Sequence, residues 1–211
     1  MTPPLLTITR DTSSFVKFQG FEIERLMPSG TISALIEWPL PPDDRDEAIT
    51  QITAAILCSA LLRLGHIAFR WDDAASAMGG TFFPEPQSPS FKTRVMASLF
   101  HGSLPAAFGV LVTDDEIMAR NLFVWGGWSL GGQAALVYDP AADPAPIVDA
   151  LQHGMDWRGR ALPPGCKLLF GSGHDGGVAL VAASSVEVLD QFIANVEAEL
   201  AAEDFKPRQH R

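Results

Sequence analysis

The chain of 211 residues has only two cysteines, and their positions do not indicate a disulfide framework. Cys58 lies inside a long apolar segment, and Cys166 comes directly before another. Cysteines placed in this way are typical of small core residues. The sequence has no Cys-x-x-Cys pair and no closely spaced Cys and His, which are the usual ligands of a zinc site. We therefore expect no metal and no other cofactor.

Basic residues are also scarce. The 15 Lys and Arg residues stand against 25 Asp and Glu residues, and the formal net charge at pH 7 is −10. Proteins that bind nucleic acid usually present a basic face to the phosphates, and anionic lipid likewise attracts basic segments. We therefore expect neither a nucleic-acid partner nor a membrane partner, whereas a basic protein would be attracted to this chain.

Long hydrophobic runs are missing as well. The longest weakly charged apolar run, 48–62, contains Thr50, Gln51, Thr53 and Ser59. It is too short and too polar to span a bilayer, which takes about 20 apolar residues. The first residues lack the basic start and apolar stretch of a secretory signal. The sequence favours a cytoplasmic protein.

No repeat, charge block or low-complexity tract divides the chain, and its hydrophobic content of 47% is ordinary for a globular protein. The most loop-like stretches, 39–44, 77–90 and 140–146, are too short to be convincing linkers between domains. We predict one compact domain over residues 1–211, with a frayed tail at 204–211.

Two helices carry the strongest sequence signals. The first is predicted over about 43–64, where apolar residues cover most of the helix circumference and indicate that the helix is buried. Gly65 follows at the position where a residue in the left-handed conformation commonly ends a helix. The second is predicted over 185–201, after a capping box formed by Ser184 and Glu187. Its apolar stripe consists of Val186, Leu189, Ile193, Val196 and Leu200.

Shorter segments rich in β-branched and aromatic residues predict strands. A hairpin is predicted for 15–27 and 31–38, joined by a turn at Pro28-Ser29-Gly30. Further strands are predicted at 66–71, 107–112, 121–125, 134–138, 167–170 and 178–182, and further helices at 90–100 and 145–152. Because strands and helices do not alternate regularly, we predict an α+β fold, with a largely antiparallel or mixed sheet and two main helices packed on it.

One glycine-rich segment carries a catalytic motif. The sequence Gly127-Trp128-Ser129-Leu130-Gly131 matches Gly-x-Ser-x-Gly and resembles the nucleophile elbow of the α/β-hydrolases. The resemblance implies hydrolysis of a small ester or amide, with Ser129 as the nucleophile, His174 as the base and an aspartate orienting that base. The candidate aspartates are Asp139, Asp143, Asp149 and Asp156.

The spacing of this motif does not fit that fold. Only about 45 residues separate Ser129 from His174, whereas each strand–helix unit between them needs on the order of 25–30. Residues 134–138 also form too short a segment for the elbow helix. Bends between two strands explain the glycines around Ser129, and a hairpin connection explains the glycines of 171–177 around His174. We therefore predict that Ser129 and His174 are not catalytic residues.

Three tryptophans favour a binding function instead. Trp71, Trp125 and Trp128 lie at or beside predicted strand ends, and Trp71 is followed by Asp72 and Asp73. Tryptophan is enriched at binding hot spots, and negative charge accelerates encounter with a basic partner. The alternative is that all three tryptophans are core residues.

Charge, composition and the missing catalytic set together predict a protein that is not an enzyme and that binds another protein. A concrete version is an immunity or antitoxin-type protein that covers the active site of a basic toxin. A serine hydrolase that uses Ser129, His174 and Asp156 is the alternative, and a small-ligand-binding domain is a further one.

Overall fold

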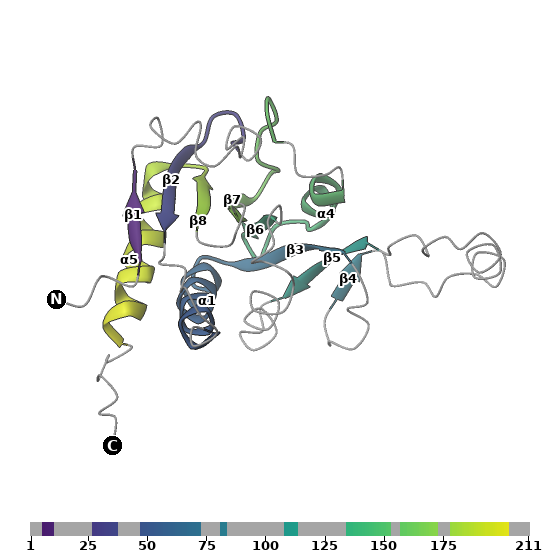
Figure 1. Cartoon of the computed structure of the whole chain (residues 1–211). Coiled ribbons are helices and arrows are strands. Elements are labelled where there is room, and N and C mark those ends of the chain that lie inside the picture. Colours follow the sequence, from purple (N-terminus) through teal and green to yellow (C-terminus); the bar gives the residue numbers. More distant parts are fainter. Residues whose placement is uncertain are drawn as a thin grey trace, which may run out of the picture.

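The computed structural model describes residues 6–10, 27–37, 47–72, 81–83, 108–113, 134–152, 157–172 and 178–202 (Figure 1). The strands in this part of the chain are β1 (Thr7–Thr9), β2 (Ile32–Glu37), β3 (His66–Asp72), β4 (Thr81–Phe83), β5 (Phe108–Thr113), β6 (Ala134–Tyr138), β7 (Cys166–Ser172) and β8 (Val178–Ala183). The helices are α1 (Glu47–Leu62), α4 (Ala145–Gln152) and α5 (Val186–Ala202).

The strands form a single sheet in the order β1-β2-β8-β7-β6-β3-β5-β4. Every pair of neighbours in this sheet is antiparallel. The strands nearest the N-terminus, β1 and β2, lie beside β8, which directly precedes the last helix. The structure confirms the predicted α+β class with a largely antiparallel sheet, and the shorter helix predicted at 145–152 is present as α4.

The helices lie on opposite faces of the sheet, with α1 and α5 side by side on one face and α4 on the other (Figure 1). We call the two cores the α1/α5 core and the α4 core. Large side chains of the α1/α5 core include Ile36, Ile56, Leu61, Phe170 and Phe192. Large side chains of the α4 core include Leu35, Leu136, Tyr138, Ile147 and Trp157. Because successive strand residues face opposite cores, central strands such as β7 carry continuous apolar runs.

Most of the predicted strands within the described residues are confirmed to within two residues of their ends, and so are the two main helices where they are described. Two short strands differ from the expectation, since β4 lies inside a stretch predicted to be a loop and β1 was not predicted. Three residues are too few to show an alternating pattern. The segments predicted at 90–100, 121–125 and 204–211, and the first strand of the hairpin, lie outside the described residues.

The predicted turn before β2 is confirmed. Gly30 has a φ of 74°, and the hydroxyl of Thr31 donates a hydrogen bond to the carbonyl of Pro28 over 2.7 Å. The backbone N–H of Ser29 donates to the carbonyl of Arg160 over 2.7 Å. This bond ties the turn to the segment that leads into β7.

Gly65 follows α1 for a different reason from the one predicted. Its φ is not in the left-handed region, unlike that of Gly30. A Cβ atom at Gly65 would lie 2.1 Å from the carbonyl oxygen of Tyr138 at the end of β6. The chain needs glycine here because two backbone segments approach each other closely, and the prediction of a left-handed helix stop is wrong.

A carbonyl in the last turn of α1 and one in the turn that follows it are satisfied by side chains from distant elements. The amide nitrogen of Asn195 in α5 donates to the carbonyl of Ala60 over 3.1 Å, and the ammonium group of Lys167 in β7 donates to the carbonyl of Leu64 over 2.7 Å. The final turn of α1 contains no basic residue of its own. These two contacts therefore replace the local cap that the sequence predicted at Gly65.

The N-terminus of α5 is capped one residue later than predicted. The hydroxyl oxygen of Ser185 accepts a hydrogen bond from the backbone N–H of Val188 over 3.3 Å, so Ser185 rather than Ser184 is the cap. The carboxyl group of Glu187 has a lowered pKa, mainly because of its hydrogen bond with the side chain of Ser185. The register of the predicted capping box is wrong by one residue.

The apolar stripe of α5 is broader than the face that the helix buries. Leu189 and Val196 are buried as predicted, and Phe192, which is outside the predicted stripe, is fully buried beside Phe170. Val186 is exposed, and two members of the stripe, Ile193 and Leu200, are only partly buried. The stripe therefore continues past the core toward the edge of the sheet, where β1 lies.

Candidate functional site

Most residues that the sequence singled out lie outside the described part of the chain. They are Ser129, His174, Asp156, Asp73, Trp125 and Trp128. The backbone of Trp71 and Asp72 is described, and these residues end β3, where they pair with Gly109 and Phe108 of β5. The structure therefore shows where the strands that flank the predicted site lie, and not the site residues themselves.

The antiparallel sheet brings these attachment points to one of its ends. Gly171, near the end of β7, pairs with Ala134, the first residue of β6. Phe69, near the end of β3, pairs with Ala135, so the last residues of β3 lie at this same end. We call it the β3/β7 end of the sheet. The segment that contains Ser129 leads directly into β6 here, and the segment that contains His174 leaves β7 here.

This arrangement changes the meaning of the spacing between Ser129 and His174. The interval between them contains β6, α4 and β7, and it returns to the sheet position beside its start. Neighbouring antiparallel strands need no helical crossover, unlike parallel strands. The interval is too short for the α/β-hydrolase fold, but it does not hold the two segments apart. That hydrolase fold is not present in the described residues, where 134–138 form a strand and no strand pair is parallel.

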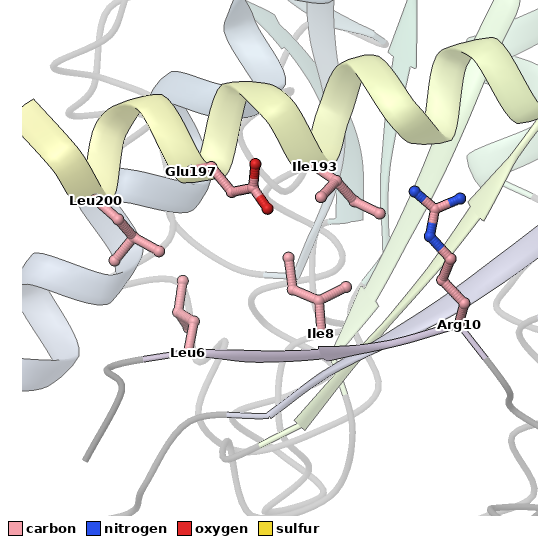
Figure 2. A pocket seen from close by; sticks show the side chains of 6 residues that line it. All are labelled: Leu6, Ile8, Arg10, Ile193, Glu197 and Leu200. Atoms are coloured by element: carbon pink, nitrogen blue, oxygen red, sulfur yellow. The ribbon is translucent and has the colours of Figure 1, made fainter.

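A second candidate site is a groove between β1 and α5, which has a volume of about 360 Å³ (Figure 2). Its lining residues are Leu6, Ile8, Arg10, Ile193, Glu197 and Leu200. The residues from the β1 segment are spaced by two and therefore share one face of the strand, whereas those from α5 are spaced by four and three and share one face of the helix. The sequence signal for the α5 side was the apolar stripe, and the β1 side had no signal.

The two charged groups of the groove lie at different places along it. Figure 2 shows Arg10 at one end and Glu197 between Ile193 and Leu200, toward the other end. The guanidinium group of Arg10 forms an ion pair with the carboxylate of Asp190 over 2.6 Å, and both side chains are about half exposed. Solvent screens such an exposed pair, so Arg10 remains open to a further carboxylate.

The thiol groups of the chain are not suited to nucleophilic chemistry. Cys58 and Cys166 are both buried, and they are not joined in a disulfide. Burial raises the pKa of the Cys166 thiol to about 12, because the thiolate would be desolvated. In the described residues, no group of three or more His, Cys, Asp or Glu side chains is placed to hold a metal ion. None of the described helices is both long and apolar enough to cross a membrane.

Comparison of the chain with protein-family models, with curated proteins and with solved structures finds no match.

Proposed function

We propose that this protein is a non-enzymatic, acidic, cytoplasmic protein that binds a basic protein partner through the β3/β7 end of its sheet. One observation carries the proposal. The strand register brings the end of β3, where Trp71 and Asp72 lie, to the same end of the sheet as Ala134 and Gly171. The segments that contain the other candidate residues are attached there. A tryptophan followed by an aspartate at the end of a strand supports recognition of a basic surface.

The charge of the chain supports the same class of partner. With a net charge of −10, the molecule attracts cationic proteins over distances comparable to the Debye length, about 10 Å at ordinary ionic strength. Proteins that bind nucleic acid are usually basic, and nucleases are among them. An immunity or antitoxin-type protein that covers the active site of a basic toxin is the specific form of this proposal.

The test uses a panel of purified basic proteins, including nucleases, and measures binding to the full chain at low and high salt. We expect at least one complex whose affinity falls as salt rises. The triple variant Trp71→Ala, Asp72→Asn and Asp73→Asn should weaken that complex roughly tenfold or more.

The control for this variant removes two exposed charges elsewhere, by Asp143→Asn and Asp149→Asn. Asparagine at 143 keeps the side-chain oxygen that accepts the N–H of Ala145 at the start of α4. The control should leave the affinity nearly unchanged. If no protein of the panel binds, or if both variants weaken binding equally, recognition through the β3/β7 end is contradicted.

A serine hydrolase is the second candidate function, and the pairing of Ala134 with Gly171 favours it because the Ser129 and His174 segments join the sheet at these paired positions. A fluorophosphonate probe tests it, since an activated serine oxygen displaces fluoride from phosphorus and leaves a stable label. Labelling that is lost in Ser129→Ala and kept in Ser29→Ala, which changes an exposed serine, would support the hydrolase. An unlabelled wild-type chain would contradict it.

A further inference from the structure

We propose that the groove between β1 and α5 is a self-association surface, in which β1 pairs with β1 of a second copy of this chain around a two-fold axis at Ile8. β1 is the first strand in the sheet order, and no described residue pairs with its outer edge. An edge strand offers unpaired backbone groups that another strand can bind. This inference does not rest on the proposed function, because it concerns an edge of the sheet and not the β3/β7 end.

The side chains beside this edge are arranged for a copy of themselves. A two-fold axis that passes through Ile8 pairs β1 antiparallel to its copy, with Ile8 opposite Ile8 and Arg10 opposite Leu6. Leu200 lies across the groove from Leu6, and Glu197 projects into the groove between Leu200 and Ile193 (Figure 2). The guanidinium group of Arg10 from one copy is thereby brought toward the Glu197 carboxylate of the other. The symmetry makes the same contact twice, as an isologous interface requires.

The apolar residues of the groove support the same register. Ile193 and Leu200 are partly buried members of the α5 stripe that the core of one chain does not cover completely. The two-fold axis keeps both α5 helices on the same face of the extended sheet. Ile193, which lies above Ile8 in Figure 2, is then close to its counterpart at the axis, whereas Leu200 lies at the Leu6 end and faces the Arg10 end of the copy. The interface therefore combines an apolar centre with charged ends, which is the usual anatomy of a protein contact.

The two acidic groups near Arg10 do not compete for it. Asp190 of the same chain already holds the guanidinium group at 2.6 Å, and in the proposed dimer Glu197 of the second copy is the second carboxylate. An arginine has five N–H donors and can bind two carboxylates at once. Because β1 is only three residues long, we expect a reversible dimer with a dissociation constant on the order of micromolar.

Charge reversal gives a test with a built-in rescue. Arg10→Glu places a carboxylate opposite Glu197 of the second copy, and Glu197→Arg places a second guanidinium group opposite Arg10. Each variant alone should raise the dissociation constant roughly tenfold or more, because two attractive pairs become repulsive. A mixture of the two variants should dimerise again, since the heterodimer restores opposite charges at both ends. Sedimentation velocity over a range of concentrations measures each state against the 22.7 kDa mass of the chain.

Arg63→Glu is the matched control. Arg63 pairs with Glu199 of α5 and its side chain is as exposed as that of Arg10, 54% against 55%, but it does not line the groove. This variant should dimerise like the wild type. A wild-type chain that stays monomeric at all concentrations would overturn the proposal, as would single variants that dimerise normally or folded monomeric variants that the mixture fails to rescue.

A cysteine at the two-fold axis tests the register independently. Ile8→Cys puts two thiols on directly opposed residues of antiparallel strands, within the Cα separation that a disulfide bridges. Mild oxidation should convert this variant to a covalent dimer. Ile32→Cys, at an exposed position of the neighbouring strand β2, should stay monomeric under the same conditions. The native thiols are buried and do not interfere. Equal cross-linking of both variants, or none in either, would contradict the register.

Discussion

Gly65 and Gly30 are both required as glycine, but for different physical reasons. At Gly65 the obstacle is another backbone, the carbonyl of Tyr138, which cannot move without disturbing β6. At Gly30 there is open space around the missing Cβ, and the obstacle is the positive φ itself. Steric overlap with backbone costs more than a left-handed conformation, because the overlap has to be relieved by moving an element.

Alanine at these two positions should therefore destabilise the protein to different extents. We expect Gly65→Ala to lower the free energy of unfolding by more than about 3 kcal/mol, and Gly30→Ala by about 1–2 kcal/mol. Urea unfolding followed by far-UV circular dichroism measures both. Equal losses would mean that β6 yields to the new methyl group, and the close approach would then not explain the glycine.

Cys166 couples stability to alkaline pH. Its folded-state pKa of about 12 lies above the ordinary value of 9.0 because the thiol is buried. Above about pH 9 the unfolded chain loses this proton while the folded chain keeps it, so stability falls as pH rises, by about 1.4 kcal/mol per pH unit up to about pH 12.

Replacing this thiol should remove the corresponding part of the pH dependence. We expect the stability advantage of the wild type over Cys166→Ala to shrink by about 1.4 kcal/mol between pH 8 and pH 10. Urea unfolding of both proteins at the two pH values gives the difference. An advantage that stays constant would show that the Cys166 thiol titrates in the folded protein as it does in the unfolded chain.

At the scale of elements, the carbonyl groups at the C-terminal side of α1 accept hydrogen bonds from side chains of β7 and α5, and not from a cap in the local sequence. The ammonium group of Lys167 lies 2.7 Å from the carbonyl oxygen of Leu64 but 3.8 Å from the carboxylate of Asp139. The shorter contact is a charge-assisted hydrogen bond to the turn that follows α1, and the longer one is a partly exposed ion pair. The hydrogen bond should therefore dominate the contribution of Lys167.

Two substitutions separate these contacts. Lys167→Met should lower the free energy of unfolding by about 1–2 kcal/mol, because the carbonyl of Leu64 loses its donor. Asp139→Asn should cost less than about 0.5 kcal/mol, since asparagine still accepts the N–H of Ala141 and only the ion pair is lost. Thermal unfolding monitored by circular dichroism compares them. A larger loss for Asp139→Asn would assign the contribution of Lys167 to the ion pair.

The elements that the sequence predicted well are those with a clear period or composition. Helix α4 was predicted with its observed bounds, and in the structure the side chain of Asp143 accepts the N–H of Ala145 at its start. The capping of α5 was displaced by one residue because two adjacent serines can both serve as caps, and only the backbone decides between them. The burial of Phe192 could not be read from its spacing, because the wide apolar surface of α5 allows more than one buried face.

At the scale of the molecule, the order of the strands was beyond sequence reasoning. β2 pairs with β8 and β3 with β6, so partners are separated by long stretches of chain that no local pattern connects. The same holds for the candidate sites. The sequence singled out Trp71 and Asp72 as binding residues, but not the common sheet end to which the candidate segments attach. The groove at β1 depends on a short edge strand without a sequence signal.

The two cores share the sheet, and this sharing predicts one cooperative unfolding transition. β7 buries Phe170 in the α1/α5 core and Leu169 in the α4 core, so neither core can open without releasing strands that form the other. Phe192→Ala should cost about 3–5 kcal/mol and Leu151→Ala about 2–5 kcal/mol, each by leaving a cavity in one core. Both variants should show a single transition in which circular dichroism and tryptophan fluorescence coincide, as expected for the single domain predicted over residues 1–211. Separate transitions for the two probes in either variant would contradict this prediction. They would mean that the chain contains two independently folding units, because one core would unfold while the other stayed packed.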